Sequence, residues 1–274
     1  MKLRARNFST SQKANRHAAN MLVDTHTHIH EGFDRDGTPE EVFAHARENG
    51  VEKIITIGTS PEDSEKARQF AEEWAKKVEK IYWTWGYHPN MYEEKYRETL
   101  TNDLNMALKA LKSPQNVGIG EIGLDYHFDG FDRERQRELL LELLQIAQDR
   151  KKPVSFHIRE AFDDFWPIFD NFHLPTSVLH SYSDSKKNLK IALEKDLYIG
   201  VNGLATFADI AHAPLERIVL ETDAPYLTPA PFRGKMNKPG YVRNIAEWAS
   251  EYYKVSIAEV EKITTKNAES IYKI

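Results

Sequence analysis

The residues best suited to chemistry are His26 and His28, which stand one residue apart in the apolar run 21–29. Side chains alternate across a β-strand, so residues two apart leave the same face and both imidazoles aim at one point. Such a pair suits a divalent metal ion, and the alternative is two hydrogen-bonded histidines on a solvated strand face. Whether other segments carry similar groups decides between these interpretations.

Four later apolar runs also carry a histidine or a carboxylate, either within the run or just beyond it. Glu121 lies in the glycine-rich run 117–124, where a carboxylate is costly unless it is paired or bound to metal. His157, His180 and Asp223 follow the same pattern. Each alone could be structural, as a satisfied histidine or as an acid that opens a turn. With the first pair they favour a metal centre, if the fold brings all six together.

The segments that carry these residues alternate with amphipathic segments along the chain. Eight strands are predicted, at residues 21–29, 53–59, 81–87, 117–124, 153–158, 177–180, 197–203 and 217–222. Between them, residues 133–150 carry a leucine stripe at helical spacing, and Pro39 and Pro61 begin helices that Thr38 and Ser60 would cap. Eight alternating units predict an α/β fold, a single-domain (β/α)8 TIM barrel with parallel strands.

The end of the barrel is predicted to be less regular than its beginning. Helices near 241–253 and 256–272 would complete the outer ring, but residues 206–214 leave room for at most about two helical turns. Barrel enzymes carry their active residues at the carboxyl ends of the strands. The histidines and acids fall at these ends, so the barrel would collect them at one mouth.

The amino-acid composition limits which residues can bind metal and where in the cell the protein is expected. The chain has no cysteine, which leaves His, Asp and Glu as metal ligands and fits a reducing, cytoplasmic location. No apolar run approaches the roughly 20 residues of a membrane span, so no membrane partner is expected. Residues 1–20 hold five basic and no acidic residues and are predicted to be a flexible N-terminal extension, before a barrel domain over 21–274. That body has 32 basic and 42 acidic residues, so any anionic substrate must be held locally.

Four histidines and two carboxylates are enough for two ions that share a bridging carboxylate. Glu121, across the mouth from the first strand, is the predicted bridge. One ion would be bound by His26, His28, Glu121 and Asp223, and the other by Glu121, His157 and His180. Two ions about 3.5–4 Å apart can bind an attacking water and the oxygens of a phosphate ester. Asp223 would orient or deprotonate that water.

At these residues the chain closely resembles the TatD-type metal-dependent deoxyribonuclease family of the amidohydrolase superfamily. The resemblance runs from Met21 to the C-terminus and is carried by the segments at residues 24–28, 86–89, 120–126, 156–159, 179–183, 221–227 and 233–239. It implies a barrel with up to two divalent ions, with Mg²⁺ favoured and Mn²⁺ or Zn²⁺ compatible with the ligands. The family's metal ligands fall on His26, His28, Glu121, His157, His180 and Asp223.

The chain departs from the family pattern in two places. Asp184 stands where the family usually has glycine, after Tyr182 in place of phenylalanine, and residues 206–214 are shorter than expected. Neither departure removes a metal ligand. Both lie where substrate would enter, so they bear on the substrate class.

Several further residues are candidates for substrate binding. His88, Arg159 and Arg233 are predicted to bind substrate, and Lys235 is either a phosphate ligand or an ordinary surface cation. Arg159 follows His157 by two residues, so both would point the same way. Tyr126, Trp83 or Trp85 could stack a base, although core packing is the preferred role of the tryptophans.

The predicted function is metal-dependent hydrolysis of DNA phosphodiester bonds, as the family's 3′-to-5′ exonucleases do on single-stranded DNA. Asp223 and Glu121 would be the catalytic residues, and single-stranded or frayed DNA ends the substrate. Hydrolysis of a small amide, imide or ester is one alternative, although many such relatives have a carboxylated lysine where this chain has Glu121. A metal-binding scaffold without turnover is the other. The oligomeric state is left open.

Overall fold

The computed structural model describes residues 21–31, 37–77, 80–91 and 100–274. The predicted N-terminal extension, residues 1–20, lies outside the described residues. No helix in the described part of the chain is long and apolar enough to cross a membrane.

Eight parallel strands form one sheet in which each strand pairs with the next along the chain. The strands are β1 Leu22–Thr27, β2 Val51–Ile57, β3 Ile81–Trp85, β4 Asn116–Asp125, β5 Val154–Arg159, β6 Val178–Leu179, β7 Tyr198–Val201 and β8 Ile218–Leu220. A bridge between Thr27 and Ala224 brings the last strand back to the first. The predicted (β/α)8 barrel is therefore confirmed, with every strand near its expected place.

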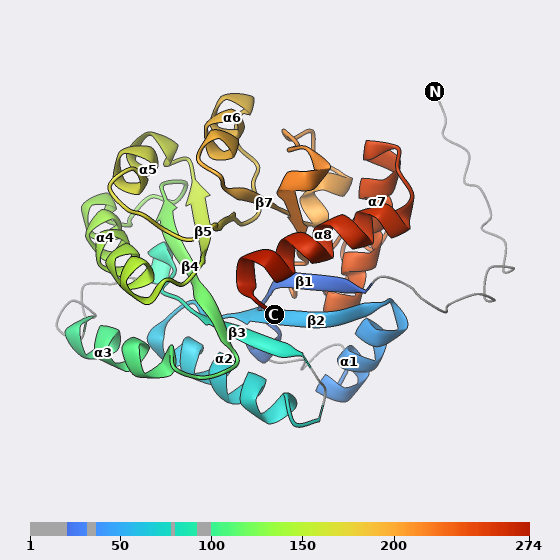
Figure 1. Ribbon diagram of the computed structural model, residues 1–274, viewed down its shortest axis with the longest axis horizontal. Coiled ribbons are helices and arrows are strands. Elements are labelled where there is room, and N and C mark those ends of the chain that lie inside the picture. The colour runs from blue at the N-terminus through green and yellow to red at the C-terminus, as the bar shows by residue number, and fades with distance from the viewer. Residues whose placement is uncertain (1–20, 32–36, 78–79, 92–99) are drawn as a thin grey trace, which may run out of the picture.

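In the described part of the chain, eight α-helices cover the outside of this barrel (Figure 1). They are α1 Pro39–Glu48, α2 Pro61–Trp74, α3 Leu100–Ala110, α4 Arg133–Arg150, α5 Phe162–Phe169, α6 Lys186–Glu194, α7 Val242–Tyr253 and α8 Ile257–Tyr272. Thr38 caps α1 in a reciprocal capping box with Glu41, and the Ser60 side chain accepts a hydrogen bond from the Asp63 amide at the start of α2. Both caps are the predicted ones.

The connection after β7 contains no α-helix, which agrees with the irregular outer layer expected there. A single 3₁₀ turn, η4 Gly203–Thr206, follows the strand, and irregular chain leads to a second short turn, η5 Leu215–Arg217. The two final helices follow β8 instead, and α8 packs against both β1 and β8. The first and last strands are thus held together from outside by one helix.

The core lies between the sheet and the helices. The leucine stripe of α4 is buried as expected, and so are Trp83 and Trp85, which are 0% and 3% exposed. These two tryptophans therefore pack in the core and cannot stack a base. A smaller buried cluster joins residues of β1, β2, β4, β6 and β8 to the C-terminal end of α8.

Candidate metal centre

The first strand delivers its two histidines to the carboxyl end of the barrel. His26 and His28 are 0% and 4% exposed. The Nδ1 atom of His28 lies 3.0 Å from the carbonyl oxygen of Ile57, and Nδ1 of His26 lies 3.2 Å from Oγ of Ser155. The outer nitrogen of each ring is therefore held by another strand, β2 for His28 and β5 across the barrel for His26, which turns Nε2 toward the interior of the mouth.

Glu121 is placed by close contacts among three strands. Its amide donates to the carbonyl oxygen of Gly58, 3.0 Å away, and its carbonyl oxygen accepts from the amide of Tyr87 at the same distance. A Cβ on Gly86 would collide with the Glu121 amide nitrogen and with the Gly58 carbonyl oxygen. The glycines of this region thus let the backbones approach closely enough to hold the Glu121 side chain, which is only 5% exposed.

Asp223 follows β8 and is turned toward the first strand. Its backbone has φ +59°, a left-handed conformation that Asp tolerates better than most residues. Its amide donates to the carbonyl oxygen of His26 at 2.8 Å. Deeper in the barrel the Asp24 carboxylate accepts from the Thr222 amide at 2.8 Å and from the Thr222 hydroxyl at 2.6 Å. These bonds fix Asp223 beside the two histidines of β1.

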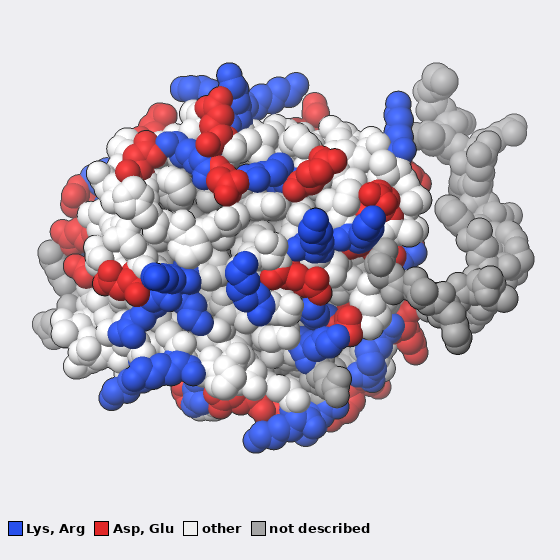
Figure 2. All heavy atoms as spheres, in the orientation of Figure 1, with Lys and Arg blue, Asp and Glu red and all other residues white. Residues whose placement is uncertain are grey.

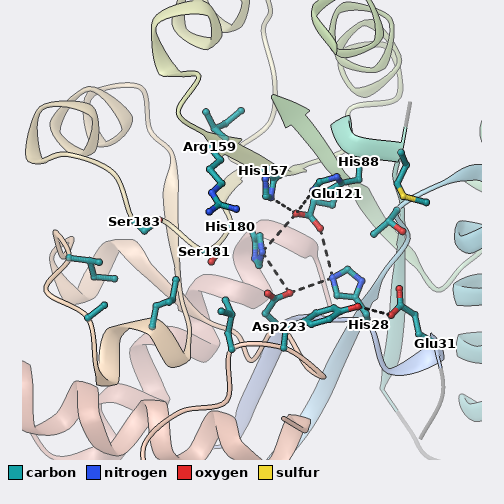
Figure 3. A pocket seen from close by; sticks show the side chains of 18 residues that line it. His28, Glu31, His88, Glu121, His157, Arg159, His180, Ser181, Ser183 and Asp223 are labelled. Atoms are coloured by element: carbon teal, nitrogen blue, oxygen red, sulfur yellow. Dashed lines mark hydrogen bonds and ion pairs between the residues drawn. The ribbon is translucent and has the colours of Figure 1, made fainter. Parts of the chain in front are cut away.

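Five of the six predicted ligands, His28, Glu121, His157, His180 and Asp223, face one cavity with Glu121 among them (Figure 3), and the sixth, His26, lies beside Glu121 and Asp223. Oε2 of Glu121 lies 3.5 Å from Nε2 of His26 and 3.8 Å from Nε2 of His28. Oε1 faces the other way, 2.7 Å from Nδ1 of His157 and 3.9 Å from Nε2 of His180. The two carboxylate oxygens therefore address two separate groups of nitrogens, which is the arrangement of a bridging ligand.

The division of ligands between the two groups differs from the predicted one in one respect. Asp223 Oδ1 lies 3.4 Å from Nε2 of His28 and 3.7 Å from Nε2 of His26, as expected, but also 3.8 Å from Nε2 of His180. His180 thus lies between the groups. His88, which is not a predicted ligand, also lies beside the second group, with its Nε2 3.7 Å from Glu121 Oε1.

The donor set fits a cation. Nε2 of His26 is fully buried and has no hydrogen-bond partner among the described residues, which is costly for a polar atom. Its separations of 3.5 and 3.7 Å from two carboxylate oxygens are too long for good hydrogen bonds. A cation lying between nitrogen and oxygen would satisfy both. The residues here therefore suit a divalent ion of the kind that His, Asp and Glu bind.

Two carboxylates outside the predicted set lie close to the outer nitrogens of two histidines. Glu221 is 1% exposed, and its Oε1 lies 2.9 Å from Nδ1 of His180 and accepts from the Ser181 amide at 2.8 Å. Asp125 Oδ2 lies 3.1 Å from Nε2 of His157. Glu221 is therefore buried against a candidate ligand and is not an exposed partner of a surface cation.

The pKa values of three candidate ligands, His28, His157 and His180, are raised, so a cation must displace protons from these histidines. Burial lowers the pKa of His28, but nearby Asp223 and Glu121 outweigh it and raise that pKa to about 9. Burial is likewise outweighed at His180, whose pKa rises to about 9 beside Glu221 and Asp223. At His157 the neighbours Asp125 and Glu121 raise the pKa to about 9.

The pKa values of Glu121 and His88 are lowered instead. Burial raises the pKa of Glu121, but the surrounding imidazoles, above all His88 and His157, bring it well below its ordinary value. Burial and the neighbouring His157 lower the pKa of His88 to about 4. His88 is therefore neutral at pH 7. Its Nδ1 accepts a hydrogen bond from the Asn90 amide at 3.1 Å, so the ring proton lies on Nε2, which faces Glu121.

A cavity of about 650 Å³ opens over this centre. Most of the predicted residues line it, as do several that the sequence did not single out. Its lining includes His28, His88, Glu121, His157, Arg159, His180 and Asp223, with Glu31, Thr59, Met91, Ser181, Ser183, Leu204, Ala208, Ile210, Tyr226 and Leu227. Figure 3 shows Arg159, Ser181 and Ser183 beyond His180, on the side away from Glu31.

The other candidate substrate contacts lie elsewhere. The Arg233 guanidinium lies over the Phe207 ring, 3.9 Å from its centroid, and is not part of the cavity lining. Lys235 lies 5.7 Å from the Phe232 ring centroid. The Tyr126 hydroxyl donates to Asp164 at 2.7 Å. Substrate binding by these residues stays a prediction that their placement does not favour.

The departure at residue 184 has a structural explanation. The Asp184 carboxylate accepts hydrogen bonds from the Ser185 amide and from the Asn188 side chain at the start of α6. The buried Tyr182 donates to the Ser185 carbonyl oxygen at 2.6 Å. Both residues therefore fix the turn before α6, and neither lines the cavity.

A (β/α)8 barrel with histidines and carboxylates converging at the carboxyl ends of its strands defines a class, the metal-dependent hydrolases of this fold. The model of the family described as TatD related DNase matches residues 23–273. The chain therefore belongs to the TatD related DNase family, as its resemblance indicated, and is a metal-dependent hydrolase.

Individual relatives support this assignment. The uncharacterized metal-dependent hydrolase YabD of Bacillus subtilis is 31% identical over 268 residues, covering 93% of this chain and 100% of YabD. The 3′-5′ ssDNA/RNA exonuclease TatD of Edwardsiella piscicida is 31% identical over 254 residues, covering 87% and 94%. The crystal structure of YJJV, a TatD homolog from Escherichia coli K12, has a TM-score of 0.80 at 28% identity and covers 92% of this chain and 98% of its own.

Proposed function

We propose that this hydrolase cleaves phosphodiester bonds at the end of single-stranded DNA, using two divalent ions that Glu121 bridges. The observation that supports it most is that the two oxygens of Glu121 face two different groups of imidazoles. Bound ions would polarise the phosphodiester and lower the pKa of the attacking water. We propose His26, His28 and Asp223 for one ion and His157 for the other, with His180 able to serve either.

The chain's own residues supply the remaining chemistry. Asp223, at the centre and 13% exposed, would accept the proton of the attacking water. His88 would donate its Nε2 hydrogen to a phosphate oxygen, because its Nδ1 already accepts from the Asn90 amide. Arg159 lines the same cavity and would bind phosphate as a charge partner.

The shape of the site favours strand ends. The centre is buried, and a cavity of about 650 Å³ is of the size that holds a small ligand, which favours the end of a single strand over a duplex. Acidic and basic side chains are intermixed over the described face shown in Figure 2. With a net charge of −5, the chain is expected to bind DNA mainly at the cavity and with a modest salt dependence.

The identity of the ions is a separate proposal. Mg²⁺ is the ion that the resemblance implies, and Mn²⁺ or Zn²⁺ would fit the same residues. The abundance of imidazole among the ligands favours Mn²⁺ or Zn²⁺ over Mg²⁺ in binding strength, because Mg²⁺ prefers oxygen ligands. A cytoplasmic location also stays a prediction.

The test is cleavage of end-labelled single-stranded DNA, with and without each ion, beside a panel of small amides and imides. We expect metal-dependent shortening from one end that is lost in Glu121→Gln and in Asp223→Asn. Glu142→Gln, at an exposed position on α4, is the matched control and should cleave normally. Amide turnover without DNA cleavage would assign the site to the other class of hydrolase, and metal binding without any turnover would indicate a scaffold.

A further inference from the structure

The cavity has two walls of different chemistry. One is the metal centre with its imidazoles and carboxylates. The other is an aliphatic wall, by which we mean four aliphatic residues among those that the loops after β7 and β8 add to the cavity lining, Leu204, Ala208, Ile210 and Leu227. Nothing in the proposed hydrolysis at the metal centre uses this second wall.

The aliphatic wall begins in a turn that buried polar groups hold in place. Asn202 is 2% exposed, and its Oδ1 accepts from the Leu204 amide at 3.0 Å. Its Nδ2 donates to Oγ of Ser181 at 2.8 Å, on the loop after β6 that also borders the cavity. The position of Leu204 is therefore fixed relative to the polar side of the cavity.

The two loops of the wall are also bound to each other. The Thr206 hydroxyl accepts from the Ala230 amide at 2.9 Å and donates to the Gly203 carbonyl oxygen at 2.7 Å. A Cβ on Gly203 would collide with the carbonyl oxygen of Leu227, so glycine is what allows the two loops to touch. Ile210 packs in turn against the hydrophobic core. The wall is thus a preformed surface.

Polar groups on the same cavity show what kind of molecule spans it. Arg159 and the hydroxyl-bearing Ser181 and Ser183 lie beyond His180 as seen from His28 (Figure 3). A ligand that meets both walls must combine an anionic group, for the metal centre and Arg159, with an adjoining apolar body. A nucleotide has this composition, because a phosphate adjoins a sugar and a flat base.

We infer that the aliphatic wall binds the sugar and base of the nucleotide whose phosphate lies at the metal centre, and that it does so without selecting the base. The inference rests on the proposed phosphodiesterase function and specifies its substrate. Aliphatic side chains offer no hydrogen-bond donor or acceptor to the edge of a base, so they discriminate little among the four bases. They exclude water from any base or sugar to a similar extent.

The test compares two substrates with one leaving group: the p-nitrophenyl esters of thymidine 5′-phosphate and of methyl phosphate. The ratio of their kcat/KM values reports what the nucleoside contributes. We expect Leu204→Ser and Ile210→Ser each to lower this ratio about three- to tenfold, the scale of losing part of one buried apolar contact. The methyl ester should be hydrolysed at an unchanged rate.

Controls separate this effect from damage to the fold. Leu141→Ser alters an exposed leucine on α4 and should leave the ratio unchanged. Leu204→Met keeps an apolar side chain at this position, so this variant should have the same kcat/KM ratio as the wild-type protein. Titration with Mn²⁺ should give the same affinity for all variants, since no ligand is altered. Thymidine 3′-phosphate esters, run in parallel, show on which side of the phosphate the wall acts.

Each outcome bears on one proposal. If both esters are hydrolysed and neither serine variant changes the ratio for either series, the wall does not bind the nucleoside and the inference is wrong, while the phosphodiesterase proposal stands. The wild-type protein should also be assayed on the p-nitrophenyl esters of all four nucleoside 5′-phosphates. A difference of more than tenfold in kcat/KM among them would refute the inference, because the wall would then select the base. If the wild-type protein hydrolyses no phosphodiester, the proposed function fails and the inference fails with it.

Discussion

Replacing Glu221 by glutamine should weaken metal binding, although Glu221 is not itself a predicted ligand. Glu221 lies 2.9 Å from Nδ1 of His180 and is 1% exposed, so solvent does little to screen the contact. The glutamine keeps the size of the side chain, and its amide oxygen can still accept from the Ser181 amide. What it removes is the negative charge behind the imidazole.

The size of the effect follows from the charge that the imidazole carries. Two full charges 2.9 Å apart would interact by about 6 kcal/mol at an effective dielectric constant of 20. A metal-bound His180 is neutral, however, so only the interaction of the carboxylate with the ring N–H and the orientation of the ring are lost. Losing such an outer partner typically weakens metal binding 10- to 100-fold, or about 1.4–2.8 kcal/mol. We expect Glu221→Gln to fall in this range.

The assay is calorimetric titration with Mn²⁺ or Zn²⁺, supported by the visible absorption spectrum of the Co²⁺-loaded protein. The affinity should fall and the Co²⁺ spectrum should shift, because the ring would lose its fixed orientation. Glu142→Gln is the matched control, and the melting temperature of the metal-free variants should equal that of the wild type within a few degrees. An unchanged affinity together with an unchanged Co²⁺ spectrum would refute the reasoning, since Glu221 would then not position His180.

Four further predictions follow from other contacts. His88→Gln should lower kcat on DNA at least tenfold in steady-state kinetics, while the affinity for Mn²⁺, measured by calorimetry, changes less than threefold. A larger loss of affinity would show that His88 is a metal ligand. The pKa values of His28 and His180 are both raised to about 9, so protons compete with the metal for their nitrogens. Metal affinity should therefore rise between pH 6 and pH 9, and binding should release protons. Calorimetry in buffers of different ionisation enthalpy measures this release, and the same heat of binding in every buffer would contradict the prediction. Gly203→Ala should lower the melting temperature by several degrees, because a methyl group would meet the Leu227 carbonyl oxygen, and an unchanged melting curve would disprove that contact. Thr38→Ala should cost about 1 kcal/mol in the free energy of unfolding through loss of the α1 cap, and denaturant titration that finds no difference would show the cap to be dispensable.

The fold could be predicted because its signals are local. Apolar runs alternating with amphipathic segments give the order of strands and helices, and Thr38 and Ser60 mark two helix starts by chemistry that needs no neighbour. The strand ends were less accurate. β6 and β8 end at Leu179 and Leu220, before the functional residues, because the chain turns there with positive φ at Ser181 and Asp223. Such turns depend on contacts that the sequence does not display.

The candidate site was predictable to the extent that its residues stand at strand ends. His26, His28 and Glu121 are recognisable because polar residues are costly in apolar runs, and the structure brings them together. The role of Glu221 was missed, since a carboxylate two residues before Asp223 looks the same whether it faces solvent or a histidine. Asn202 gave no signal, because it acts through loops whose paths are set by the assembled barrel.

The bond between Asp24 and Thr222 joins parts of the chain that lie 198 residues apart, and it does so directly beneath the candidate ligands. The seam where the first strand meets the last is therefore also the floor of the metal centre. Half of the ligand set comes from the two strands that meet there, so high-affinity binding must await completion of the topology. An ion bound by both His26 and Asp223 would link the first strand to the segment that follows the last. The free energy of metal binding would then add to the stability of the closed barrel.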